Sequence, residues 1–238
     1  MSVSTRPPAA ARLPSDSAET LTLQAYGRLR ADILGGRLEA GERLRLERLK
    51  SAYGFGMSPL REALSRLAAE ELVVAEDRRG FRVASISAAE LAEVTRLRKR
   101  LECMALADSI ALGDVDWEAG IVAAFHRLSK APLPLGADRP GVADDWEAMH
   151  RDFHAALIAA CASPWLLKFC GQLAAHAERY RRIRHYNSVG PEQMARDVER
   201  EHRELLEATL ARDSARACAI LEQHFDRTAS VVAAVIGP

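Results

Sequence analysis

The stretch Ser58-Pro59-Leu60-Arg61-Glu62-Ala63-Leu64-Ser65-Arg66-Leu67 determines how the first third of this 238-residue chain is interpreted. Its leucines recur at helical spacing and share one face. Ser58 followed by Pro59 is typical of a helix start, because a serine hydroxyl caps free backbone N–H groups and proline fits the first helical position. We therefore predict a helix that follows a Ser58 cap and runs to about Glu71.

Short elements surround this helix in a specific order. Periodicity predicts a helix over 21–34 and a short helix over 44–53 on the N-terminal side. Apolar residues predict two strands, at 72–74 and 81–83, joined by a charged turn. Each element is too small to form a core alone. The order of two helices, a glycine turn, a third helix and a hairpin therefore predicts a winged helix-turn-helix.

The remainder of the chain, from residue 87, shows helical periodicity and no strand signal. The predicted amphipathic helices cover residues 88–112, 117–131, 144–161, 164–186, 191–212 and 214–236. Helices of these lengths predict an antiparallel all-α bundle, so the fold class is mainly α. The domain organisation that we expect is a flexible N-terminal arm (1–19), a winged helix-turn-helix domain (20–86) and an all-helical domain (87–238).

The charge balance initially argues against binding to nucleic acid. The chain has 33 Lys and Arg against 33 Asp and Glu, a formal net charge of zero. Residues 1–86, however, contain 14 basic against 11 acidic residues, while residues 87–238 contain 19 against 22. A basic first part and an acidic second part are compatible with a DNA-binding domain followed by a separate domain of different function.

The sequence also indicates the compartment. Its four cysteines are widely spaced without a C-x-x-C pair, which is typical of reduced thiols rather than of a disulfide framework. No apolar run approaches the roughly 18 residues of a membrane span, and the N-terminus lacks the apolar region of a secretory signal. We therefore expect a cytoplasmic protein without a membrane partner.

The residues of the first part resemble those of a known family. The runs 25–38 and 41–44 resemble the opening of GntR-type transcription regulators, the run 58–67 resembles their recognition helix, and the hairpin resembles their wing. Many members have Ser-Arg where this chain has Gly56-Met57, so one DNA-contacting arginine of the family is missing here. The helical remainder resembles the FCD ligand-binding domain of the FadR subfamily.

A narrower resemblance concerns the effector. The run 58–65, the run Phe81-Arg82-Val83-Ala84-Ser85 and the pair Tyr180-Arg181 resemble the carbon-starvation-induced repressors that respond to glutarate or 2-hydroxyglutarate. The resemblance implies a homodimer that binds a palindromic DNA operator, with a small carboxylate, such as one of these dicarboxylates, as its effector.

The predicted winged helix-turn-helix contains five candidate DNA-binding residues. Arg61 lies on the first turn of the recognition helix, opposite the leucines, where its guanidinium can contact guanine with two hydrogen bonds. Ser58 offers a helix N-terminus to a phosphate, and Arg45 precedes the second helix as another phosphate contact. Arg79 and Gly80 at the tip of the wing are candidates for the minor groove.

Four of the seven histidines are predicted to converge in the helical part. His150 and His154 are one helical turn apart on an apolar face. His202 and His224 lie on the apolar faces of the last two helices. Three helices thus direct imidazoles toward one interior, and imidazole is the commonest metal-ligating side chain.

The resemblance implies a metal site at the same residues. Metal-binding FCD domains carry an aspartate, a histidine four residues later and one histidine on each of the last two helices. His154, His202 and His224 match the three histidines, and His150 replaces the aspartate. Four neutral ligands favour zinc, with nickel or copper as alternatives, over magnesium or calcium. The lost carboxylate leaves two interpretations open, a four-imidazole metal site or a contact of His150 with an anionic effector.

Arg98 lies on the apolar stripe of its predicted helix, and a charge directed at a core needs a counter-charge. Two explanations are open: an internal partner such as Glu102 or Asp108, or a carboxylate ligand that the guanidinium binds bidentately. Tyr180 and Arg181, with Arg184 as the alternate, are candidates for a second contact to that ligand.

Three functions are compatible with these features. The main prediction is a repressor that leaves its operator when a small carboxylate binds beside a metal. The second is a metal sensor in which the ion itself is the signal. The third, a metal-dependent hydrolase, is disfavoured because the sequence has no H-E-x-x-H motif and no general base near the histidines. We therefore predict that the protein is not an enzyme.

Overall fold

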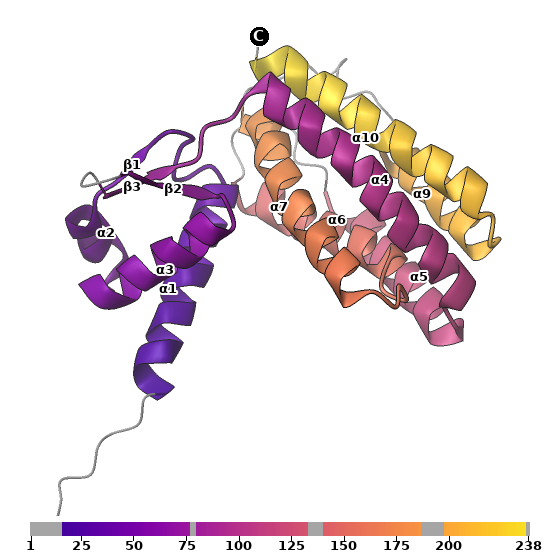
Figure 1. Cartoon of the computed structure of the whole chain (residues 1–238). Helices are drawn as coiled ribbons and strands as arrows, with labels where there is room; N and C mark the ends of the chain where they lie inside the picture. Colours follow the sequence, from indigo (N-terminus) through magenta and orange to yellow (C-terminus); the bar gives the residue numbers. More distant parts are fainter. Residues whose placement is uncertain (1–15, 77–79, 133–139, 187–197, 237–238) are drawn as a thin grey trace, which may run out of the picture. The chain divides into compact units, whose positions relative to one another are not determined.

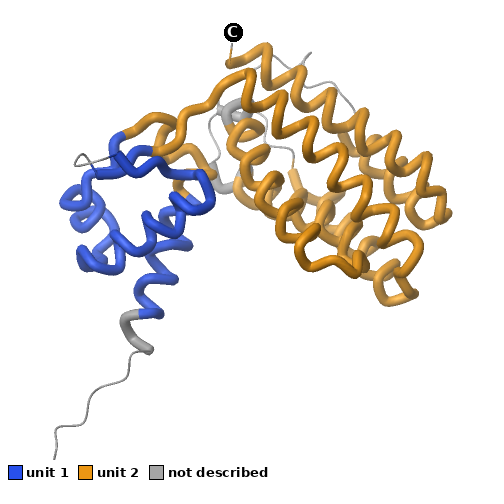
Figure 2. Tube along the Cα trace, viewed as in Figure 1, with its two compact units in different colours: residues 1–31, 43–82 blue, residues 32–42, 83–238 orange. Residues whose placement is uncertain are grey.

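The computed structural model describes residues 16–76, 80–132, 140–186 and 198–236. The chain divides into two compact units (Figure 2). The N-terminal unit contains residues 1–31 and 43–82, and the helical unit contains residues 32–42 and 83–238. The division at 82/83 lies close to the expected boundary at 86, but the segment 32–42 groups with the helical unit.

The N-terminal unit has the element order of a winged helix-turn-helix, which confirms the predicted fold class. Its elements are α1 (Asp16–Leu34), β1 (Arg43–Leu44), α2 (Leu46–Tyr53), α3 (Met57–Ala69), β2 (Val73–Glu76) and β3 (Gly80–Val83) (Figure 1). The strands form one sheet in the order β1-β3-β2. In the antiparallel β1–β3 pair, Arg43 lies opposite Arg82 and Leu44 opposite Phe81.

Two predictions about this unit were wrong at the edges of its elements. Strand β1 was missed, because two residues are too few to show an alternating pattern. Helix α1 begins at Asp16, inside the arm predicted for 1–19. The nearest upstream residue that disfavours a helix interior is Pro14, and the residues between it and Leu21 contain no glycine or proline that would stop the helix. The rest of the predicted arm, 1–15, lies outside the described residues.

The start of α3 also differs from the prediction. The N-cap is Gly56, without a side-chain capping bond, and Ser58 is the second residue of the helix rather than its cap. Pro59 is therefore the third helical residue. Proline is tolerated there because the first N–H groups of a helix have no intrahelical acceptor to lose. The helix ends at Ala69, and the chain reverses at Glu71, whose φ is +59°.

The helical unit consists of α4 (Ala88–Leu112), α5 (Val115–Lys130), α6 (Pro140–Leu157), α7 (Pro164–Tyr186), α9 (Val198–Leu210) and α10 (Ser214–Ile236). The bounds of α4, α7 and α10 agree with the prediction. Helix α5 begins two residues earlier, because Asp114 caps it by accepting the Trp117 N–H at 2.9 Å. Helix α6 begins and ends four residues earlier than predicted, and the predicted start of α9 lies outside the described residues.

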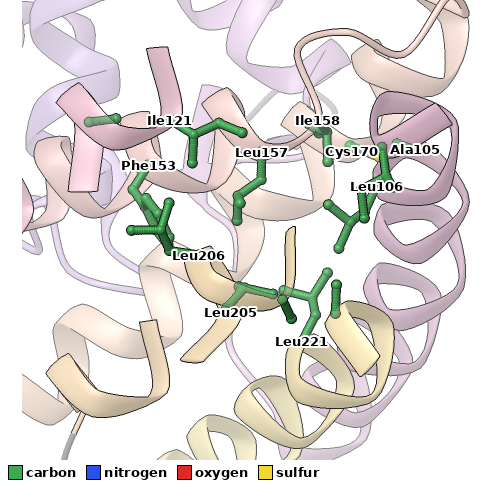
Figure 3. Close-up of a cluster of buried hydrophobic side chains, with 14 of the residues drawn as sticks. Ala105, Leu106, Ile121, Phe153, Leu157, Ile158, Cys170, Leu205, Leu206 and Leu221 are labelled. Carbon is green, nitrogen blue, oxygen red and sulfur yellow. The ribbon is translucent and has the colours of Figure 1, made fainter. Parts of the chain in front are cut away.

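The core of the helical unit forms where the bundle helices meet. Figure 3 shows labelled side chains from α4, α5, α6, α7, α9 and α10 around this cluster, among them Phe153, Leu157, Leu205 and Leu221. Phe153 is adjacent in sequence to His154, so the same turn of α6 contributes to the core and to the histidine cluster described below. In the described part of the chain, no helix is both long enough and apolar enough to span a membrane.

Candidate functional site

Helix α3 of the N-terminal unit separates an apolar face from a polar one. Leu60, Leu64 and Leu67 have no exposed surface, whereas Arg61 lies on the exposed side. Arg61 makes no hydrogen bond or ion pair with the described residues. Its guanidinium thus keeps its full set of donors for a base edge or a phosphate.

Polar contacts between α1 and α3 explain why the acidic residues of α3 do not neutralise Arg61. The Thr22 hydroxyl donates to Glu62 at 3.0 Å, and Arg30 pairs with Glu70 at 3.2 Å. Tyr26 also donates its phenolic proton to Glu70. The carboxylates of Glu62 on α3 and of Glu70 at its C-cap are therefore held against α1.

The other candidate DNA-binding residues lie at the edges of elements. Arg45 occupies the N-cap position of α2 and is exposed, without a partner among the described residues. Ser58 is exposed in the first turn of α3. Gly80 starts β3 with a φ of +92°, a left-handed conformation that favours glycine. Arg79 lies outside the described residues.

The four predicted histidines come together in the helical unit. His150 and His154 project from α6, His202 from α9 and His224 from α10, and one ring nitrogen of each lies within 4.8 Å of the others. All four side chains are buried. Among the described residues, neither the Nδ1 of His150 nor either ring nitrogen of His154 has a hydrogen-bond partner. Buried polar atoms usually have partners, so these nitrogens are available to bind a ligand.

The electrostatic environment keeps the α6 histidines neutral. Burial, followed by the neighbouring imidazoles, holds the pKa values of His150 and His154 well below their usual range. Neutral imidazole is the form that binds a metal ion. These residues therefore fit a divalent cation that prefers nitrogen ligands.

A buried carboxylate, that of Glu201, orients one histidine of the cluster. The Nδ1 of His224 lies 3.0 Å from an oxygen of Glu201, and the other oxygen of Glu201 accepts from Arg227 at 2.9 Å. A carboxylate behind a histidine fixes the ring and raises the basicity of its other nitrogen, as is common at metal sites. The role of Glu201 was not predicted, although its position directly before His202 was an available signal.

A cavity of about 430 Å³ lies beside the cluster. It is lined by the polar residues His150, His154, Arg98, Glu102 and Arg181 and by apolar residues such as Ile158, just after α6, and Leu167 of α7. The volume lies within the range of small-molecule sites. The predicted residues Arg98 and Arg181 therefore lie at the wall of the same cavity as two of the histidines.

Arg98 and Arg181 both have internal partners. Arg98 donates to Glu102 at 2.7 Å, one of the two internal partners considered for it, and its guanidinium lies 4.0 Å from the centre of the Phe225 ring. Arg181 donates to Glu147 through Nη2 at 2.8 Å and through Nε. Glu147 was not predicted, although it precedes His150 by nearly one turn of α6.

Tyr180 contacts the start of α4 and does not lie at the wall of the 430 Å³ cavity. Its hydroxyl donates to Glu90 at 2.8 Å and accepts from the Ser87 N–H at 3.2 Å. Its ring packs with Leu91 and Val232. Tyr180 lines a smaller cavity together with Arg98 and Arg181, so its contact with an effector stays a prediction.

Comparisons with known proteins agree with both units. Residues 21–83 match the model for bacterial regulatory proteins of the gntR family, and residues 93–227 match the FCD domain. The chain belongs to the GntR family of transcription regulators, in its FCD-containing branch. It is 40% identical to the HTH-type regulator BphR of Paraburkholderia xenovorans over 94% of this chain and 89% of that one. It is 39% identical to the transcriptional repressor GlaR of Escherichia coli over 85% and 91%.

Solved structures of GntR-type regulators share the fold. Escherichia coli McbR superimposes with a TM-score of 0.76 at 22% identity, covering 91% of this chain and 99% of that one. A regulator from Rhodococcus sp. RHA1 gives 0.69 at 20% identity, covering 90% and 98%. Family membership confirms the predicted function class, a DNA-binding transcription regulator and not an enzyme.

Replacing Glu201 by glutamine tests its role behind His224. We expect metal affinity to fall by roughly 10- to 100-fold, the usual effect of losing a carboxylate partner of a metal-bound histidine. Isothermal titration with zinc measures this change. Glu199→Gln is the matched control, since Glu199 lies on the same helix but is exposed and pairs with Arg203. Equal zinc affinity in the Glu201→Gln, Glu199→Gln and wild-type proteins would contradict the assignment.

Proposed function

We propose that this GntR-family regulator is a homodimeric repressor that leaves a palindromic operator when a small carboxylate binds next to a metal ion. The observation that carries the proposal is a cluster of four buried imidazoles, two of which line a cavity together with Arg98 and Arg181. In each protomer, Arg61 contacts bases of one half-site, while Arg45, Ser58, Arg79 and Gly80 contact the DNA backbone or the minor groove.

The proposed metal ligands are His150, His154, His202 and His224. Four imidazoles suit zinc, with nickel as the alternative, because nitrogen donors are poor ligands for magnesium and calcium. A bound divalent ion acts there as a Lewis acid for a carboxylate oxygen. Because all four ligands are neutral, the two positive charges of the ion stay uncompensated within the ligand set, which favours an anionic effector.

The existing ion pairs of Arg98 and Arg181 limit how an effector carboxylate can bind. Arg98 and Arg181 remain charged donors, but Glu102 and Glu147 already occupy part of each guanidinium. An effector carboxylate must share or replace these contacts. A guanidinium has five N–H donors, so it can bind a second carboxylate without losing the first. A dicarboxylate of the glutarate type, with one group toward the metal and one toward an arginine, matches this arrangement.

Helix α7 provides a route from the cavity to the segment that follows β3. Arg181 lines the cavity, and the two preceding residues bind residues 84–90. Arg179 donates to the Ala84 carbonyl at 2.5 Å and to the Ser85 carbonyl at 3.4 Å, and Tyr180 holds Ser87 and Glu90 as described. A shift of α7 on effector binding therefore changes how this connecting segment is held. The operator is released only if the effector binds the two states with different affinities.

A thermal-shift screen tests the proposal. Glutarate, 2-hydroxyglutarate and monocarboxylates are added to zinc-loaded and to chelated protein. A ligand that binds only the folded state stabilises it by about 2.7 kcal/mol at 100 times its Kd, and the midpoint rises accordingly. We expect a carboxylate to raise the midpoint in the zinc-loaded form and to have a much smaller effect after chelation. Failure of every carboxylate in both forms would contradict an effector site beside Arg98.

A metal sensor is the second candidate, and one observation favours it. Four protein ligands complete the tetrahedral coordination that is typical of structural zinc sites, whereas sites that bind a further ligand usually keep a position open. In this case zinc alone, without any carboxylate, changes operator affinity.

A further inference from the structure

Two half-buried cysteines face each other where α4 and α10 lie side by side (Figure 1). The Cys103 sulfur lies 3.7 Å from the Cys218 carbonyl oxygen, and the Cys218 sulfur lies 3.5 Å from the Cys103 carbonyl oxygen. The two thiols also hydrogen-bond to each other. Each sulfur thus contacts the other residue's backbone, and such a close approach of the two backbones is what a disulfide requires.

The two thiols differ in acidity. The hydrogen bond from Cys103, against the opposing effect of burial and with help from Ser214, lowers the pKa of Cys218 to about 7. The same hydrogen bond and burial raise the pKa of Cys103. The lowered pKa favours the thiolate form of Cys218, while the raised pKa of Cys103 favours its protonated form. The thiolate is the reactive form.

The remaining cysteines of the chain have different surroundings. Cys161 and Cys170 are buried. Burial raises the pKa of Cys170 to about 12, and the Cys161 thiol donates to Asp108 at 3.7 Å. These thiols are poor nucleophiles, so oxidation is expected to be selective for the α4–α10 pair.

We propose that Cys103 and Cys218 form a peroxide-sensitive dithiol that closes to a disulfide between α4 and α10. The Cys218 thiolate attacks one oxygen of hydrogen peroxide and breaks the O–O bond, which gives a sulfenic acid and a hydroxide that takes up a proton. The Cys103 sulfur then attacks the Cys218 sulfur. The S–S bond forms, the S–OH bond breaks, and the hydroxide leaves as water with the Cys103 proton. Two thiols and one peroxide thus give one disulfide and two waters.

The position of this bridge connects it to the histidine cavity. Glu102 precedes Cys103 and lines the cavity, while His224 lies farther along α10. A disulfide would fix the two helices that carry these residues. The oxidation itself depends only on the two sulfurs, so the proposal stands or fails independently of the proposed effector and metal.

The test uses the full chain, treated with chelator and then with a small molar excess of hydrogen peroxide. The expected product is a chain that is lighter by about 2 Da and not covalently linked to another chain. Two of its four thiols are lost, and dithiothreitol recovers both. Cys103→Ser and Cys218→Ser should each abolish the mass loss, and Cys161→Ala should retain it.

Three results would overturn the proposal. One is a wild-type chain that keeps four titratable thiols under these conditions. Another is a chain that only gains oxygen, about 16 Da at a time, without losing two hydrogens. The third is a disulfide that links two chains, seen as a covalent dimer without reductant, because the geometry requires both sulfurs to come from one chain.

Discussion

Replacing Arg61 by alanine is expected to weaken binding to a selected operator by about 30-fold to 10⁴-fold. A bidentate arginine–guanine contact is worth about 1–3 kcal/mol, and a dimer loses it in both half-sites. Arg61 is exposed on α3 and has no partner among the described residues, so its removal costs the fold little. Because no partner is left unpaired, the loss should appear in specific binding rather than in stability.

The measurement is fluorescence anisotropy with an operator selected from a random-sequence pool and with an unrelated duplex, at one fixed salt concentration. Arg216→Ala is the matched control, since it removes the same charge from an exposed position on α10. Arg45→Ala should lower both affinities together, as expected for a phosphate contact. If Arg61→Ala binds the selected operator as tightly as Arg216→Ala does, the recognition-helix assignment is wrong.

Replacing His154 by alanine is expected to lower zinc affinity by about a hundredfold or more. Structural zinc sites bind with about 10–16 kcal/mol shared among four ligands, so each ligand is worth roughly 3 kcal/mol. His154 is the most informative choice, because neither of its ring nitrogens has a hydrogen-bond partner in the described part of the chain. Zinc at 1,000 times its Kd should stabilise the wild-type protein by about 4 kcal/mol, which raises the midpoint by roughly 8–16 °C. The variant should lose most of this rise.

His126→Ala is the control for this experiment, since His126 is exposed on α5. Circular dichroism of the zinc-free proteins checks that the His154 variant keeps its helices. If zinc shifts the midpoint of the His154 variant as much as that of the His126 variant, His154 does not bind the zinc and the proposed four-histidine site is wrong.

Long periodic segments were the most predictable part of the fold. The bounds of α4, α7 and α10 followed from continuous helical patterns bounded by glycine, proline or serine. Strand β1 was missed because its two residues are defined by pairing with β3, which no local pattern reveals. The Ser58 cap was wrong because the chain uses the backbone of Gly56 to start α3, and any residue with extended dihedral angles can serve there.

The candidate site was predictable where side chains share a helix face. His150 and His154 are separated by one turn, and the apolar faces of α9 and α10 identified His202 and His224. The partners of these residues were harder to find. Glu147 meets Arg181 across 34 positions and Glu201 meets His224 across 23, so each pair depends on how two helices pack. The hydrogen bonds of Tyr180 to Ser87 and Glu90 likewise depend on how α7 packs against the start of α4.

The decisive measurement for a carboxylate-released repressor is operator affinity with and without carboxylate, on zinc-loaded and on chelated protein. We expect the carboxylate selected by thermal shift to weaken operator binding by at least about tenfold in the zinc-loaded form, a coupling of roughly 1.4 kcal/mol. Chelation should abolish most of this effect. Operator affinity that does not change at saturating carboxylate would rule out a carboxylate effector, and a change caused by zinc alone would identify the protein as a metal sensor.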